Sequence, residues 1–208
     1  MIDKRISIIK GVLRHPKQAL QEIDSAGNYY FGGAIALLIF WSIVEGVMGY
    51  QVIGSIDLSY GIKDALYTFS LTFLFIILTY YIGRRLKGIA KFRNIFSTIM
   101  YSSIPGDIGF SILYPPIYLM QNQDGTALAY ALLALLGIGL LVTLPFVIWG
   151  IILNIFACSE SHKFSKKRSF AVMIISLIIT LGIFNGIQYA IDPTYFSWLM
   201  EDFPLNFL

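Results

Sequence analysis

The chain has 208 residues, of which 57% are hydrophobic and 13% are charged, and its mean hydropathy is +0.72. Soluble domains carry about 25% charged residues, so this composition excludes an ordinary soluble globular protein. The formal net charge is +3, but no basic patch lies on a segment able to fold in water, which argues against nucleic-acid binding. Cys158 is the only cysteine, so no disulfide can form within the chain.

The first 28 residues are charged throughout and predict a cytoplasmic, interfacial segment. Apolar residues recur at helical spacing on one face, and basic residues lie on the other: Ile2, Ile6, Ile9 and Leu13 against Lys4, Lys10 and Arg14. Such an amphipathic helix lies in the headgroup layer of a membrane. Two interpretations stay open, an anchor for the rest of the protein or an element for docking and curvature sensing.

A second short helix is predicted to follow directly. Pro16 suits its first turn, Leu20 and Ile23 supply its apolar contacts, and Gly27 is a suitable stop.

Five stretches are long and apolar enough to cross a bilayer, which takes about 20 residues per helix. They cover residues 29–50, 65–82, 97–120, 126–157 and 170–191. Alternation with a period of two is absent, so these runs predict helices and not strands. The predicted fold class is all-α, a polytopic membrane bundle of five transmembrane helices with an N-terminal interfacial amphipathic helix. The spans occupy residues 29–191, and residues 192–208 form a short extracytoplasmic tail.

The basic residues predict the orientation, because cytoplasmic loops of membrane proteins are enriched in Lys and Arg. Of the 15 Lys and Arg residues, 14 lie before the first span, between the second and third, or between the fourth and fifth. Lys63 alone lies on the opposite side. The N-terminus is therefore predicted to be cytoplasmic and the C-terminus extracytoplasmic.

The connection between the second and third spans forms a predicted cytoplasmic basic surface. Its members are Arg84, Arg85, Lys87, Lys91 and Arg93. These charges fit the topology, and phosphate binding is the alternative, although the loop has no Walker-type glycine pattern.

Two carboxylates fall within predicted spans, Glu45 in the first and Asp107 in the third. Ionisable residues inside a membrane are costly and mark candidate functional sites. The helix is predicted to break or kink at Pro105 and Gly106, which would place Asp107 at the start of an outer half-helix as a cap. The alternative is a cation or proton site shared with Glu45.

Other polar and small residues complete the candidate sites within the spans. Ser102 and Ser103 can bond carbonyls near the break, whereas Asn185 and Gln188 of the fifth span suit interhelical hydrogen bonds. Gly182 and Gly186 form a small-xxx-small pattern for helix packing, within the chain or between copies of it.

The sequence holds no recognisable catalytic constellation, cofactor motif or metal-ligand spacing, so an enzyme is not expected. Both histidines, His15 and His162, fall in polar segments and are expected to be interfacial or solvated.

The basic loop leads into the run Phe-Ser-Thr-Ile-Met-Tyr-Ser-Ser-Ile-Pro at residues 96–105. Together with five spans after a cytoplasmic leading segment, this run resembles the Yip-domain family, named for interaction with Ypt/Rab GTPases. The resemblance covers nearly the whole chain and suggests a short, prokaryotic-type member. It implies membrane organisation or trafficking, and small GTPases as partners, although the GTPase-linked members generally carry a longer N-terminal region.

Two functional hypotheses follow. The first is a non-enzymatic membrane scaffold or membrane-organising protein, with lipids, other membrane proteins or a second copy of itself as partners. The second is a small transporter, channel or lipid-moving protein that uses the polar seam around Glu45 and Asp107. A prokaryotic plasma membrane fits the short form better than an organelle membrane.

Overall fold

The computed structural model describes the backbone of residues 2–53, 58–121 and 126–191, and the side chains of residues 7–48, 61–113 and 135–190. The described residues form helices and no strands, which confirms the all-α class. The helices are α1 (Ile2–Arg14), α2 (Pro16–Ser25), α3 (Gly27–Ile53), α4 (Leu58–Arg85), α5 (Phe92–Gln121), α6 (Thr126–His162) and α7 (Lys166–Ile191). The predicted tail, residues 192–208, lies outside the described residues.

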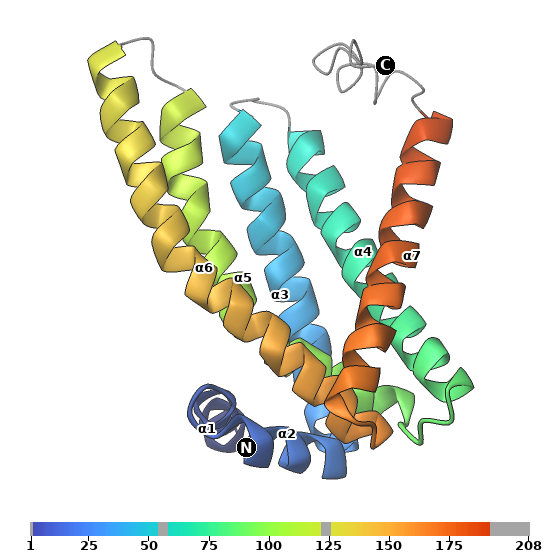
Figure 1. Cartoon of the computed structure of the whole chain (residues 1–208). Helices are drawn as coiled ribbons and strands as arrows, with labels where there is room; N and C mark the ends of the chain where they lie inside the picture. Colours follow the sequence, from blue (N-terminus) through green and yellow to red (C-terminus); the bar gives the residue numbers. More distant parts are fainter. Residues whose placement is uncertain (1, 54–57, 122–125, 192–208) are drawn as a thin grey trace.

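The five long helices, α3 to α7, contain the five predicted spans and run alternately up and down (Figure 1). Four stretches within the described residues are long and apolar enough to cross a membrane, namely Gly27–Met48, Gly61–Arg85, Leu135–His162 and Lys166–Ala190. Helix α5 is not among them, and its described side chains end at residue 113. The count of five spans therefore stays a prediction.

Helix α5 packs most extensively on α6, through glycines that let the two backbones approach. A Cβ atom added at Gly150 would lie 3.0 Å from the Cα of Gly106, and one at Gly109 would lie 2.7 Å from the Cβ of Phe146. The Thr143 hydroxyl donates a 2.9 Å hydrogen bond to the carbonyl of Gly109. This close contact joins α5 and α6 near the middle of α5.

The helix is not broken at Pro105 and Gly106, whereas a kink there stays a prediction. Helix α5 continues without interruption through Pro105 and Gly106. A membrane helix tolerates proline where neighbouring helices and serine side chains compensate, and Gly106 serves the approach of α6. Asp107 therefore lies inside a helix and caps no half-helix.

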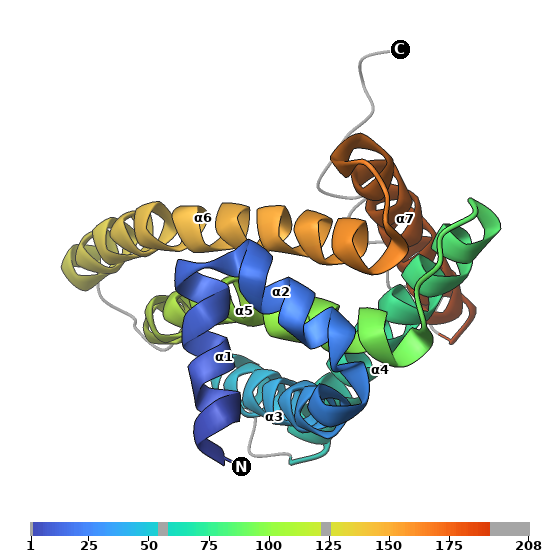
Figure 2. The same cartoon turned by 90° about the horizontal axis from the view of Figure 1, so that it is seen from below.

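Helices α1 and α2 lie across the end of the bundle where α3 begins (Figures 1 and 2). Pro16 starts α2, and Leu20 and Ile23 are fully buried, as predicted. Among the described side chains of α1, Ile8 and Val12 are buried, whereas Leu13 is 41% exposed. Part of the predicted apolar face of α1 is therefore turned away from the protein, because the adjacent face packs on α2 and α5.

Gly27 begins α3 and does not simply end α2. A Cβ atom there would lie 2.2 Å from Oδ1 of Asn94, so glycine lets α5 approach. The Asn94 side chain in turn donates a 2.6 Å hydrogen bond to the carbonyl of Asp24 at the end of α2.

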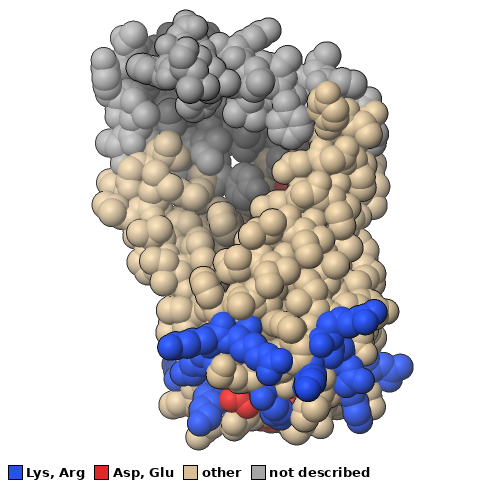
Figure 3. Space-filling model, turned by 45° about the vertical axis from the view of Figure 1, so that its right-hand side comes forward, with Lys and Arg blue, Asp and Glu red and all other residues tan. Residues whose placement is uncertain are grey.

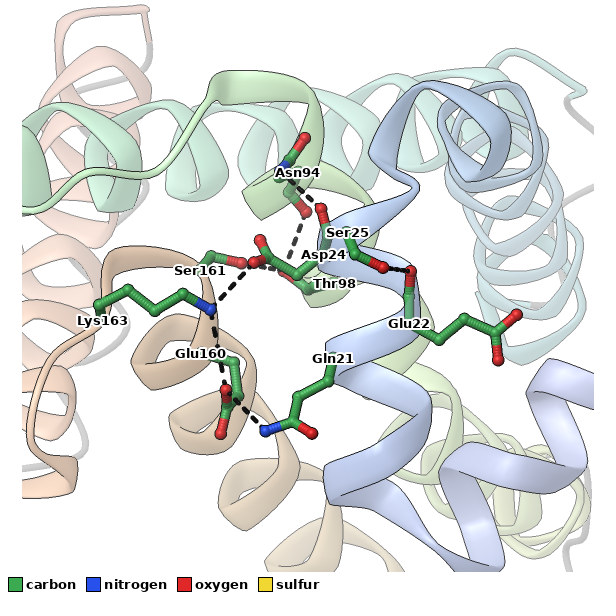
Figure 4. A network of polar contacts seen from close by, with 9 residues as sticks. All are labelled: Gln21, Glu22, Asp24, Ser25, Asn94, Thr98, Glu160, Ser161 and Lys163. Atoms are coloured by element: carbon green, nitrogen blue, oxygen red, sulfur yellow. Dashed lines mark hydrogen bonds and ion pairs between the residues drawn. The ribbon is translucent and has the colours of Figure 1, made fainter.

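A polar network joins α2 to the ends of α5 and α6 (Figure 4). Lys163 lies 3.2 Å from a carboxylate oxygen of Asp24, and Gln21 donates a 3.3 Å hydrogen bond to Glu160. The lysine side chain is 51% exposed, and such surface ion pairs contribute about 0–1 kcal/mol. Burying a large aliphatic side chain contributes about 1.5–3 kcal/mol, so apolar packing of α1 and α2 outweighs these ion pairs.

The expectation that both histidines are interfacial or solvated needs correction for His162, which is only 1% exposed, whereas His15 is exposed. The ring stacks on Phe164, with 5.2 Å between centroids. Gly83 and Gly88 make room for the ring, since a Cβ at either position would lie 2.2 Å from one of its nitrogens.

Helices α4 and α6 end in the same way beside this ring. Lys87 and Lys163 have φ values of 66° and 58°. The N–H of Gly88 bonds the carbonyl of Gly83 at 2.8 Å, and the N–H of Phe164 bonds that of Ser159 at 3.0 Å. These are Schellman-type ends, and they fold the loop after α4 around His162.

Candidate functional site

A cavity of about 350 Å³ lies between the long helices and is lined by all five of them. Its polar lining is Ser42, Glu45, Thr68, Thr72, Ser103, Asp107 and Asn154. Its apolar lining is Leu38, Trp41, Leu71, Phe75, Ile99, Met100, Phe110 and Leu177. Ligand sites in proteins share this character, a mostly apolar wall with a few convergent polar groups.

The two carboxylates predicted as a shared site line this one cavity, Glu45 from α3 and Asp107 from α5. The Ser103 hydroxyl donates a 2.9 Å hydrogen bond to Oδ2 of Asp107 and lies 3.0 Å from the carbonyl of Met100. Because Ser103 precedes Asp107 by one turn, α5 itself orients the carboxylate.

Ser102 lies behind the lining and is fully buried. Its hydroxyl donates a 2.7 Å hydrogen bond to the side-chain carbonyl of Asn154, which faces the cavity from α6. The adjacent serines of α5 therefore have different roles. Ser102 fixes the asparagine of α6, and Ser103 fixes Asp107.

Several lining residues were not predicted from the sequence. Ser42 lies three residues before Glu45 on α3, and Thr68 and Thr72 lie four residues apart on α4. Residues at these spacings share a helix face. Polar residues at helical spacing within apolar runs were therefore the signal that could have found them.

Two predicted residues stand apart from the cavity. Asn185 is exposed on α7 and Gln188 is half-buried, and neither lines the cavity. A Cβ atom added at Gly182 or Gly186 would meet nothing within 4 Å in the described part of the chain. Packing of these glycines against another chain stays a prediction.

The predicted basic surface lies at the end of the bundle that α1 and α2 cover, where Lys and Arg residues gather (Figure 3). All five of its residues are exposed. Two of them also hold the local structure. Arg84 donates to the carbonyl of Gly88 at 3.3 Å, and Arg93 donates to the side chain of Asn28 at 3.1 Å.

Among the described residues, no group of three or more His, Cys, Asp or Glu side chains is placed to hold a metal ion. The cavity offers two carboxylates, hydroxyl groups, an amide and aromatic rings. This set attracts positive charge and provides acceptors for hydrogen bonds.

The long apolar helices define a multi-pass integral membrane protein of the helical class. The family model described as the Yip1 domain matches residues 10–187, and the chain belongs to this family. No curated protein and no solved structure matches the chain significantly. The family resemblance read from residues 96–105 is thereby confirmed.

Proposed function

We propose that this protein is a small membrane transporter whose central cavity takes up a cationic solute. The observation that carries the proposal is the position of Glu45 and Asp107 on one cavity within the bundle. Carboxylates inside a membrane are costly and face interior cavities that serve substrate or ion pathways. A scaffold has no need of such groups, so the cavity favours transport over the scaffold hypothesis.

The test is transport by the purified protein in proteoliposomes, measured as charge movement on a solid-supported membrane. The panel comprises Na⁺, K⁺ and small amines. We expect current with wild type and at least about a tenfold loss for Asp107→Asn, because the site then lacks one of its charges.

Asp64→Asn is the matched control, because Asp64 lies on α4 but does not line the cavity. This variant should keep wild-type current. Absence of current with every member of the panel would count against transport, as would equal currents from Asp107→Asn and wild type.

We also propose that the protein crosses the membrane five times, with α5 as a span in addition to α3, α4, α6 and α7, and with the α1–α2 end in the cytoplasm. The 30 residues of α5 give a helix of about 45 Å, and α5 lies alongside α6 over much of its length (Figure 1). The gathering of basic residues at one end supports the orientation (Figure 3).

A second candidate function, membrane organisation through anionic lipids, is supported by a groove between α6 and α7. This groove, of about 330 Å³, is lined by Ile152, Ile155, Phe156, Lys166, Lys167 and Phe170. The Lys166 ammonium lies 4.1 Å from the ring centroid of Phe156. Basic pockets between cytoplasmic helix ends suit lipid phosphates.

Retention of anionic lipid by the purified protein tests this role. Lys166→Gln with Lys167→Gln should lower the phosphatidylglycerol that co-purifies, whereas Lys10→Gln with Lys91→Gln removes the same charge away from the groove. Equal lipid retention by both double variants contradicts the role. Deleting α1 is a poor test, because it would also remove the buried Ile8 and Val12.

A further inference from the structure

The lining of the central cavity points to one class of cation. We propose that the cavity binds a small organic ammonium ion, a protonated amine with an apolar substituent, in preference to an inorganic cation. This inference rests on the proposed function and names the substrate class of the same site.

Aromatic rings on separate helices give the first argument. Trp41 from α3, Phe75 from α4 and Phe110 from α5 line the cavity together with both carboxylates. Ammonium groups bind over aromatic faces by cation–π attraction, which strengthens where water is excluded. An inorganic cation such as Na⁺ binds oxygen ligands and has little use for such walls.

The ligand chemistry gives the second argument. Ca²⁺ takes six to eight oxygen ligands, and metal sites generally need several charged or imidazole donors in one place. Among the described residues no group of three or more His, Cys, Asp or Glu side chains gathers in this way. Two carboxylates and the hydroxyls of Ser42 and Thr72 instead match the N–H donors of an amine.

The size of the cavity gives the third argument. Its volume of about 350 Å³ is within the range of small-molecule sites, about 300–1,000 Å³. A bare cation would leave most of it empty or filled with water. Leu38, Leu71 and Met100 offer an apolar wall for an organic substituent, while Asp107, held by Ser103, receives the charged end.

Binding to the full chain in lipid nanodiscs, measured by isothermal titration calorimetry, tests the proposal. The probes are benzylammonium, its neutral counterpart benzyl alcohol, and Na⁺ and K⁺ as chlorides. We expect benzylammonium to bind at least about tenfold more tightly than benzyl alcohol, because the alcohol lacks the charge that the carboxylates and rings attract. Neither Na⁺ nor K⁺ should displace it at equal concentration.

Variants of Trp41 distinguish a loss of ligand recognition from a loss of folding. Trp41→Leu should weaken benzylammonium binding about threefold to tenfold, whereas Trp41→Phe, which keeps a ring, should recover most of it. Trp149→Leu is the matched control, since Trp149 lies on α6, is 37% exposed and does not line the cavity. Equal losses in Trp41→Leu and Trp41→Phe, or a loss in Trp149→Leu, would overturn the ring argument.

The two proposals fail in different ways. Binding of Na⁺ or K⁺ that is lost in Asp107→Asn, without binding of amines, overturns the ammonium proposal and leaves cation uptake standing. Benzyl alcohol binding as tightly as benzylammonium also overturns it, because the site is then only apolar. Benzylammonium binding that survives both Asp107→Asn and Glu45→Gln overturns the proposed site itself, and with it both proposals.

Discussion

Single residues at the α1–α2 end of the bundle have roles that their type alone does not reveal. His162 is buried between Gly83 and Gly88, and its ring nitrogens come within 2.2 Å of where a Cβ would stand at either glycine. A polar loop sequence containing glycine, arginine and lysine predicts a solvated turn. The side chain that packs against this turn, His162, comes from the end of α6, which is distant in the sequence.

We expect Gly83→Ala to destabilise the protein by about 1–3 kcal/mol, because overpacking forces the His162 ring or the backbone to move. Thermal unfolding in detergent measures the effect. In a double-mutant cycle, Gly83→Ala should destabilise the His162→Ala background less than it destabilises wild type, because the ring that the new Cβ meets is absent.

Gly182→Ala is the control for this experiment. Its Cβ would meet nothing within 4 Å in the described part of the chain, and alanine is the better helix former by about 0.5–1 kcal/mol. Its melting temperature should therefore equal or exceed that of wild type. A lower melting temperature for Gly182→Ala than for Gly83→Ala would contradict the glycine contacts described here.

At the scale of the element, contacts between helices determine features that the sequence of one helix alone does not predict. Proline and glycine in α5 predict a break when α5 is considered alone. The contact with α6 makes glycine useful for another reason, because Gly106 and Gly150 meet backbone to backbone. The helix therefore stays continuous, and Asp107 faces a cavity instead of capping a helix end.

Gly150→Val should separate α5 from α6 and destabilise the bundle by about 1–3 kcal/mol, because its Cβ would lie 3.0 Å from the backbone of Gly106. Gly137→Val is the control on the same helix, where a Cβ meets nothing within 4 Å. Thermal unfolding of both variants gives the comparison. Similar melting temperatures for Gly150→Val and Gly137→Val would show that the close α5–α6 contact contributes little to stability.

The attachment of α2 gives a second prediction at this scale. Asn94→Ala should lower stability by about 1–3 kcal/mol, because it leaves the Asp24 carbonyl without its 2.6 Å bond and a gap beside Gly27. Lys163→Ala should lower it by no more than about 1 kcal/mol, because its ion pair is half exposed. Chemical denaturation measures the free energy of unfolding of both variants. A larger loss for Lys163→Ala than for Asn94→Ala would contradict the greater weight given to the Asn94 hydrogen bond.

At the scale of the whole molecule, the distribution of charge and the alternating direction of the long helices agree. Fourteen of the 15 Lys and Arg residues belong to the end that α1 and α2 cover or to the loops beside it. By the positive-inside rule, we therefore propose that this end lies in the cytoplasm. The five proposed spans would place the end of α7 on the other side of the membrane.

Single cysteines labelled with a membrane-impermeant maleimide test this topology in intact cells. Lys63→Cys and Ala190→Cys should react from outside, whereas Lys87→Cys and Lys167→Cys should react only after the membrane is opened. Cys158 can stay in place, because it is fully buried. Labelling of Lys63→Cys and Ala190→Cys from opposite sides would contradict five spans.

The sequence by itself determined the helical class and the positions of the long helices, and it singled out the carboxylates of Glu45 and Asp107. These follow from hydropathy and spacing along one helix, which are local properties. The tertiary structure alone decided that Glu45 and Asp107 line one cavity, that Ser42, Thr68 and Thr72 join them, and that His162 is buried. These facts depend on which helix faces meet, and that is set by the close approach of small residues on different helices, such as Gly106 and Gly150.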